Sequence, residues 1–408
     1  MILPRTITGS KGAQVLTALV IAAPVSVHAQ QERTLGAPDA TYEEPFSLVG
    51  AGNVRELRDG RLIVADPRDK LLQVIDLEKG SSVAIGREGS GPAEFGMPMR
   101  LFDAPGDTTL MYDPVNSRYL VIAGATPVNT FRMDAGAAAG PGGMRVGLSI
   151  ATATDAKGRL YFQAPGVTYG PEGRPQPADS AAIIRYDRGT QRLDTLAWVK
   201  LPANNVQTSG SARNTRFMIG AANPLTPRDA WTVFPDGRVA IVRAADYHVD
   251  WISPAGSTVS SPAIKYAPVR MTRADIEEEE ALRDRARQSS VRMSMTNVNG
   301  QVSRSASVGP EPNAAPLEPL DNWPDVKPPF RPGSGTVWAR PNGELWVQRT
   351  EKAGTKGTLY DVIDAKGAVT YRVRVPEGWR VVGMGDGTVY TTKLDEDDLA
   401  YLQRHRLK

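Results

Sequence analysis

The sequence contains no cysteine among its 408 residues and only three histidines, His28, His248 and His405. Without cysteine the chain can form no disulfide, no thiol nucleophile, no cysteine-linked lipid anchor and no cysteine zinc site. Because His28 falls in the export signal described next, two histidines remain, too few for a three-histidine zinc site. A Ser-His-Asp triad would have to use one of those two, and no G-x-S-x-G elbow follows a strand.

No apolar run is long enough to span a bilayer. The most apolar stretch, 15–27, follows Arg5 and Lys11, has about half the roughly 20 residues that a spanning helix needs, and ends at V-H-A. This is the form of an export signal, so we predict cleavage after Ala29 and a mature chain in the periplasm or outside the cell. An uncleaved N-terminal anchor is the alternative.

Neither sign of charge is in clear excess. Removing residues 1–29 takes away two of 48 basic residues and none of 45 acidic ones, which leaves 46 − 45 = +1. Such a balance gives no electrostatic basis for binding nucleic acid or an anionic membrane, and we expect no membrane insertion after cleavage.

Glycine turns, in contrast, are abundant and recur with one pattern: a turn that ends in glycine and then an apolar strand. The pattern occurs six times, at 59–66, 105–113, 157–164, 236–243, 342–349 and 386–393. Asp-Gly and Asn-Gly suit tight hairpins because both residue types tolerate positive φ. A third strand follows each time, and a fourth usually follows a further turn, which describes the four-stranded blades of a β-propeller.

The last unit has only three strands before Lys408, and 42–50 (YEEPFSLVG) is the candidate for the fourth. Joining the two ends of the chain in one blade closes the ring without a free sheet edge. We therefore predict an all-β fold, one six-bladed propeller over 30–408 closed by an N-terminal strand.

The long segments all fall at one face of this disc. The turns between first and second strands and between third and fourth strands are short, whereas the other connections include 166–180, 202–228 and an insertion, 272–334, between blades 4 and 5. Long ordered loops are uncommon unless they serve a function, so this face is the expected binding face.

The insertion begins with a predicted surface helix over 272–288. Thr272 is its expected N-cap, Glu279 and Arg283 can pair, and Ile276, Leu282 and Ala286 form a thin apolar stripe. A lid or docking helix and a solvated decoration are both open. Trp323 lies in a proline-rich segment, 320–330, that we expect to pack across the channel mouth.

The stretch 61–98 resembles an NHL repeat: a strand ending in Asp, a polar turn, a strand ending in Asp-x-x-x-Gly, and an I-G-x-x-G-x-G-x-x-x-F-x-x-P connector. The segment 110–122 repeats part of it with Asp113 and Arg118. The resemblance implies a six-bladed propeller of a bacterial exported type. A peptide-amidating lyase of this family holds zinc with several histidines, and the two histidines left here do not support that activity.

Propeller lactonases, similar in fold, hold a divalent cation with Glu, Asp and Asn at the tops of the inner strands. The residues expected at those positions here are Asn53, Arg100, Ser149, Asp229, Thr336 and Arg380. Because Asp229 is the single carboxylate among them and two are cationic, we predict neither a metal nor another cofactor. The strand-end acids Asp66 and Asp113 are predicted to close Asx turns, with Lys70 or Arg118 beside them.

Two functions remain open. The preferred one is a monomeric, non-enzymatic propeller that binds a protein, peptide or glycan on its long-loop face; the alternative is a divalent-cation-dependent hydrolase or a lyase in the channel mouth. Arginines at the mouth could hold an anion, or they could be neutralised by Glu88, Glu94 and Asp229. The candidate ligand-binding residues are Arg87, Glu88, Arg100, Asp229, Trp323 and Arg380.

Overall fold

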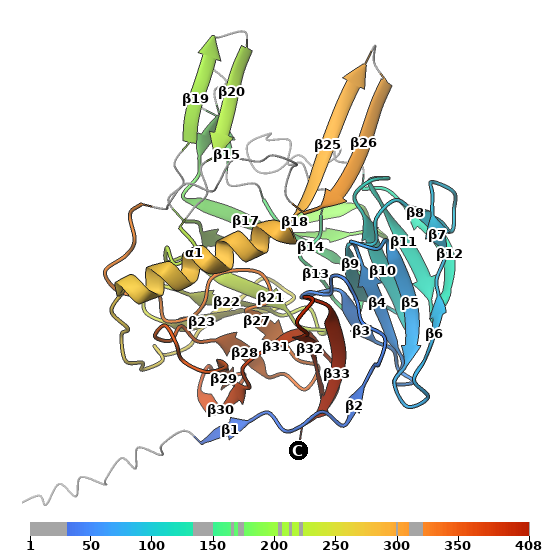
Figure 1. Cartoon of the computed structure of the whole chain (residues 1–408). Helices are drawn as coiled ribbons and strands as arrows, with labels where there is room; N and C mark the ends of the chain where they lie inside the picture. Colours follow the sequence, from blue (N-terminus) through green and yellow to red (C-terminus); the bar gives the residue numbers. More distant parts are fainter. Residues whose placement is uncertain are drawn as a thin grey trace, which may run out of the picture.

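Six four-stranded antiparallel units arranged around a central axis make up the body of the computed structural model (Figure 1). The structure describes residues 31–133, 150–164, 167–169, 175–202, 206–211, 214–219, 223–298, 301–309 and 321–407. Successive inner strands contact one another around most of the ring. The predicted six-bladed propeller is confirmed.

Each blade runs from its inner to its outer strand in chain order. Blade 1 is β3 (Val54–Glu56), β4 (Leu62–Asp66), β5 (Leu71–Asp76) and β6 (Ser81–Ala84), and blade 2 is β9 (Arg100–Ala104), β10 (Thr108–Asp113), β11 (Arg118–Ala123) and β12 (Thr126–Phe131). Blade 3 is β13 (Ala153–Thr154), β14 (Leu160–Gln163), β17 (Ser180–Asp187) and β18 (Arg192–Lys200), and blade 4 is β21 (Ala230–Val233), β22 (Val239–Arg243), β23 (His248–Ile252) and β24 (Thr258–Ser260). Blade 5 contains β27 (Val337–Ala339), β28 (Leu345–Gln348), β29 (Thr358–Ile363) and β30 (Val369–Val375), and blade 6 contains β31 (Trp379–Met384), β32 (Thr388–Leu394) and β33 (Ala400–Arg406).

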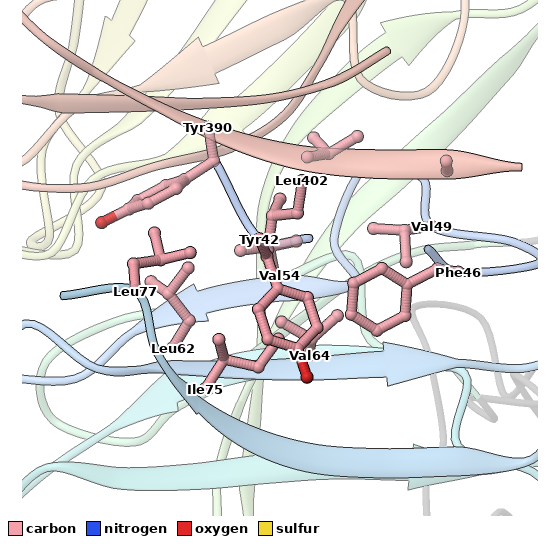
Figure 2. Close-up of a cluster of buried hydrophobic side chains, with 12 residues drawn as sticks. Tyr42, Phe46, Val49, Val54, Leu62, Val64, Ile75, Leu77, Tyr390 and Leu402 are labelled. Carbon is pink, nitrogen blue, oxygen red and sulfur yellow. The ribbon is translucent and has the colours of Figure 1, made fainter. Parts of the chain in front are cut away.

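The ring is closed by an N-terminal strand, but two residues earlier than predicted. β2 (Ala40–Thr41) pairs antiparallel with β33, and an isolated bridge joins Phe46 to Ala400. The rest of 42–50 contributes side chains rather than a ladder: Figure 2 shows Tyr42, Phe46 and Val49 packed against residues of blades 1 and 6. The apolar residues of 42–50, which suggested a strand, therefore help to close the ring through hydrophobic side-chain contacts.

A second N-terminal strand was not expected from the sequence. β1 (Glu32–Thr34) pairs parallel with β30 and makes blade 5 five-stranded. The Arg374 side chain bonds Glu32 at 2.9 Å, and the Leu35 amide donates to the Arg374 carbonyl. Residues 32–41 thus tie the outer edges of blades 5 and 6 together.

All further elements are inserted into connections of the loop-rich face. They are the pairs β7 (Arg87–Glu88) with β8 (Glu94–Phe95) and β15 (Val167–Tyr169) with β16 (Pro175–Pro177), the hairpins β19 (Val206–Ser211) with β20 (Asn214–Ile219) and β25 (Val291–Val298) with β26 (Gln301–Val308), and helix α1 (Arg273–Gln288). Figure 1 shows the hairpins β19–β20 and β25–β26 projecting on the same side of the disc. Among the described residues, no helix is long and apolar enough to cross a membrane.

The helix begins as predicted but docks by a different face. Thr272 is the N-cap of a capping box with Asp275. The buried residues of α1 are Asp275 and Glu279, whereas Ile276 and Leu282 are only half-buried. The helix therefore packs on the propeller through acidic side chains, not through the thin apolar stripe.

Ion pairs hold this acidic face. Asp275 lies 2.6 Å from Lys327 Nζ and accepts from the Ala353 amide at 2.7 Å, and Glu279 Oε2 accepts from Arg331 Nη2 at 2.7 Å. Burial alone raises the pKa of Asp275, but the Lys327, Thr272 and Ala353 donors outweigh it and lower that pKa to about 2.

Candidate ligand site at the loop-rich mouth of the channel

The turn at 50–53 fills part of the mouth, just before the inner strand of blade 1. The Gly52 amide donates to Val382 of β31 at 3.3 Å, and the Leu101 amide of β9 donates to Gly52 at 2.8 Å. A Cβ on Gly335, in the connector to blade 5, would meet Ala51. The turn thus bridges blades 6, 1 and 2 and reaches the blade 5 connector.

Asn53, expected near a metal, closes this turn. Its Oδ1 accepts from the Gly50 amide at 2.9 Å, its Nδ2 donates to the Met99 carbonyl, and the residue is 8% exposed. The side-chain oxygen and nitrogen of Asn53 are therefore both hydrogen-bonded to backbone groups, in two neighbouring connectors.

Asp229, the one carboxylate among the predicted inner-rim positions, is also committed. It accepts from the Lys200 amide at 2.9 Å, the Ala244 amide at 3.1 Å and Arg243 Nη1 at 2.7 Å, and its side chain is 6% exposed. These bonds join blades 3 and 4. Among the described residues, no three His, Asp or Glu side chains are placed to hold a metal ion; Ser149 lies outside the described residues.

Arg87 and Glu88 lie in the connector after blade 1 and are neutralised there. Arg87 Nε lies 2.8 Å from Glu94 Oε1 with its side chain 82% exposed, and Glu88 pairs with Lys70. Glu94 also accepts from the Gly91 amide at 2.8 Å. A shallow hollow of about 430 Å³ lies beside this loop, but its two charged lining residues are already bonded to each other.

The glycines of this connector serve the backbone path. Gly86 has φ +66°, and a Cβ there would overlap the Ala93 carbonyl oxygen. A Cβ on Gly89 would overlap the Glu94 carboxylate. These glycines let the loop fold around Glu94. This agrees with the sequence pattern, in which the loop is the connector between two blades.

Arg100 and Arg380 differ from Arg87. They are the first residue of the inner strand β9 and the second residue of the inner strand β31, and neither has a carboxylate within ion-pair distance in the part of the chain that the structure describes. Arg100 is half-buried, its guanidinium carbon 5.6 Å from the centre of the Phe102 ring, and burial lowers its pKa. Arg380 is exposed. The structure therefore separates the predicted rim arginines into a neutralised one and two without a described counter-charge.

Sequence reasoning missed a third arginine of this kind, Arg228, two residues before β21. It is half-buried, and burial together with the nearby Arg331 guanidinium lowers its pKa. It directly precedes the carboxylate Asp229, but Asp229 binds Arg243.

Trp323 is half-buried in the segment 321–330, which runs beside 269–271. The Met271 amide donates to the Asp325 carbonyl at 2.9 Å, and the Lys327 amide donates to the Val269 carbonyl at 2.8 Å. Lys327 Nζ donates to the Glu351 carbonyl at 2.7 Å. The segment thus connects the start of α1 to the loop between β28 and β29 of blade 5.

The strand-end aspartates have the predicted structural role and also accept hydrogen bonds from a more distant connector. Asp66 Oδ1 closes an Asx turn with the Arg68 and Asp69 amides, and its Oδ2 accepts from Ser47 at 2.7 Å. Asp113 accepts from Asn116, and also from the Gly96 amide at 2.9 Å and the Met97 amide at 3.2 Å. Each carboxylate therefore fastens the connector that leads into its own blade.

The expected ion-pair partners of these aspartates are only partly present. Arg118 Nε is 4.0 Å from Asp113, whereas Lys70 pairs with Glu88 and not with Asp66. Backbone amides, which lie closer, are the main partners.

The two histidines are strand residues in different blades. His248 Nε2 lies 3.2 Å from Asp250 in blade 4. His405 is buried in blade 6 between Thr391 Oγ1 at 2.9 Å and the Gly36 carbonyl at 2.8 Å, and burial lowers its pKa.

A larger hollow, of about 600 Å³, lies on the opposite face between blades 1 and 6, where no sequence pattern indicated a site. Its four basic side chains all pair with acids: Arg61 with Asp59, Lys79 with Asp76, Arg404 with Asp39 and Glu78, and Arg406 with Asp39. Such neutralised surface offers little electrostatic attraction to a charged ligand.

The known proteins that this chain resembles are distant from it in sequence. No family model matches the chain, and none of the curated proteins compared matches it. Similar solved structures include a provisionally assigned exported protein from Bacteroides fragilis (11% identity, 93% of this chain and 99% of that one, TM-score 0.44) and a gluconolactonase from Xanthomonas campestris (10%, 91% and 99%, 0.40). A virginiamycin B lyase from Staphylococcus aureus is 13% identical over 89% of this chain and 99% of its own, with a TM-score of 0.35.

Proposed function

We propose that this protein is an exported, NHL-like propeller that binds a protein, peptide or glycan ligand on its loop-rich face without catalysis. The observation that carries the proposal is the position of the inserted elements. α1 and the described hairpins all enter at connections of that face, while the opposite face is made of turns such as Asp59-Gly60 and Asp386-Gly387. Surface loops on a rigid scaffold are where binding residues concentrate.

The test is a binding screen followed by mapping. The purified chain 30–408 is applied to peptide and glycan arrays, and hydrogen exchange is measured with and without the best array ligand. Slowed exchange is expected in 85–99, in the hairpins and in 321–336. Protection confined to the short turns at 57–61, 253–257 and 364–368 would place the ligand on the wrong face and refute the proposal.

A matched pair of variants sharpens this test. Replacing 292–307 by a short Gly-Ser turn removes the hairpin β25–β26 and should weaken binding of the array ligand. Lys79→Gln, on the short-turn face, should leave binding unchanged. Equal affinity of both variants and the wild-type chain would remove the hairpin from the site.

The alternative, a divalent-cation-dependent hydrolase in the channel mouth, has a separate test. Thermal unfolding is followed with calcium, with chelator and with a panel of lactones. Stabilisation by calcium that is lost in Asp229→Asn and Asn53→Ala, together with lactone turnover, would establish the alternative and displace the binding proposal.

Export has its own measurement. β1 begins at Glu32, so a chain that starts at Gln30 keeps both N-terminal strands. Mass spectrometry of the protein from periplasm or medium is expected to find Gln30 as the N-terminus. An intact Met1 in the membrane fraction would contradict cleavage after Ala29.

A further inference from the structure

Two half-buried arginines of the loop-rich mouth, Arg100 and Arg228, differ from the partly buried Arg243 and Arg349. Arg243 and Arg349 also lose hydration, but Asp229, Asp250 and Asp361 beside them raise their pKa values overall. Arg100 and Arg228 have no such neighbour among the described residues, and burial leaves their pKa values lowered. A desolvated charge without a counter-charge lowers the stability of the fold. We therefore expect such a charge to be kept where a function requires it.

Their positions in the ring are related. Arg100 begins the inner strand of blade 2, Arg228 precedes the inner strand of blade 4 by two residues, and Arg380 is the second residue of the inner strand of blade 6. Antiparallel order puts the starts of all inner strands at the loop-rich face. The three residues thus lie on alternate blades at the loop-rich face.

The described surroundings of Arg228 and Arg100 add no paired carboxylate. Arg331, next to Arg228, donates to Glu279 of α1, and no carboxylate pairs with Arg228 among the described residues. Gly52 makes room for Arg100: a Cβ at Gly52 would lie 3.1 Å from Arg100 Nε, and Gly52 has φ +86°. Among the described residues, the mouth therefore holds Arg100 and Arg228 without a paired carboxylate.

We propose that the loop-rich mouth binds an anionic group of its ligand, a carboxylate or a phosphate, with Arg100 as the principal contact and Arg228 and Arg380 as supporting cations. This rests on the proposed function, because it names the chemistry of the ligand on the same face. A guanidinium presents two parallel N–H donors to a carboxylate or phosphate, and partial desolvation strengthens the attraction. Gly52 is a positioning residue for Arg100.

The test uses the mature chain with inorganic phosphate and citrate as probes, at constant ionic strength against sodium chloride. Calorimetry should show binding of at least one probe to the wild-type chain. Arg100→Gln should weaken it at least about tenfold, and Arg228→Gln should weaken it in the same direction. Arg100→Lys keeps the charge but loses the paired donors and should bind at an intermediate level. Arg87→Gln, on the same face but already neutralised, is the matched control and should bind as the wild type does.

A second readout separates a ligand contact from a structural arginine. Without probe, Arg100→Gln should melt at or above the wild-type temperature, because it removes a desolvated charge. A lowered melting temperature would show that Arg100 supports the fold and would overturn the proposal.

Failure of the anion site differs from failure of the binding face. If neither probe binds, or if Arg100→Gln binds as the wild type does, the anion inference is wrong while an array ligand can still map to the loop-rich face. If the array ligand maps to the short turns while phosphate still depends on Arg100, the proposed function fails and the anion site remains.

Discussion

The buried pair of Asp275 and Lys327 gives the most specific prediction about stability. Their side chains are 1% and 4% exposed and 2.6 Å apart, and the carboxylate also receives the Thr272 and Ala353 amides. Asp275→Asn leaves the Lys327 ammonium buried without its counter-charge, which typically costs about 3–5 kcal/mol. Urea unfolding should therefore shift to lower concentration, and the amides of α1 should exchange faster.

The same pair predicts a pH dependence. The folded pKa of Asp275 is about 2 against an ordinary 3.8, so the carboxylate adds stability above about pH 3.8 that is lost as the pH falls toward 2. The difference of about 1.8 pH units corresponds to about 2 kcal/mol. Asp275→Asn should lack this part of the acid dependence.

Asp284→Asn is the matched control, because Asp284 is exposed on the same helix. It should change the free energy of unfolding by less than about 0.5 kcal/mol. If Asp275→Asn and Asp284→Asn have the same stability and the same acid limb, the argument that an ion pair anchors α1 is wrong.

Three further predictions concern the propeller. Gly86→Ala should destabilise by more than Gly60→Ala, because both glycines have positive φ but a Cβ is obstructed only at Gly86; equal melting temperatures would contradict this. Asp113→Ala should cost about 2–4 kcal/mol in chemical unfolding, because it leaves buried amides without an acceptor, whereas Asp364→Ala, at a half-buried turn residue whose hydrogen bond is exposed, should cost about 1 kcal/mol or less; the reverse order would refute the connector role. Burial holds the pKa of His405 below 6.5, so the unfolded chain takes up a proton first and stability falls as pH drops below about 6.5; His405→Gln should lessen that fall between pH 7 and 5, and an unchanged slope would exclude His405 as its source.

The sequence was sufficient for the features that local chemistry controls. Asp-Gly turns such as that at Asp59 predict hairpins because their φ requirements are met within a few residues. Thr272 predicted the helix start, and Asp66 predicted an Asx turn, because a cap or turn bonds to its own neighbours in the chain. Six repeats of such turns and strands were enough to predict a propeller.

Only the tertiary structure decided which charges are neutralised. In the sequence Arg87, Arg100 and Arg228 look alike, each with an acid a few residues away. Arg87 finds Glu94 within its own loop, whereas Asp229 turns to Arg243 of the next strand and leaves Arg228 unpaired among the described residues. Ion-pair partners depend on strand register and on contacts between blades, which no short stretch of sequence encodes.

The ring closure shows the same division. The apolar residues from Tyr42 to Val49 indicated that the N-terminus joins the last blade, since such residues must be buried somewhere. In the structure these residues contribute side-chain packing, whereas Ala40 and Thr41 pair with β33 through backbone hydrogen bonds. This division depends on how blades 1 and 6 meet. Sequence alone determined the number of blades and the face that carries the insertions, because turns and loop lengths are local. The tertiary structure decided which strand closes the ring, because Ala40 and Arg404 are hundreds of positions apart. It also decided which arginines lack a carboxylate partner among the described residues, because acids close to them in the sequence bind other groups.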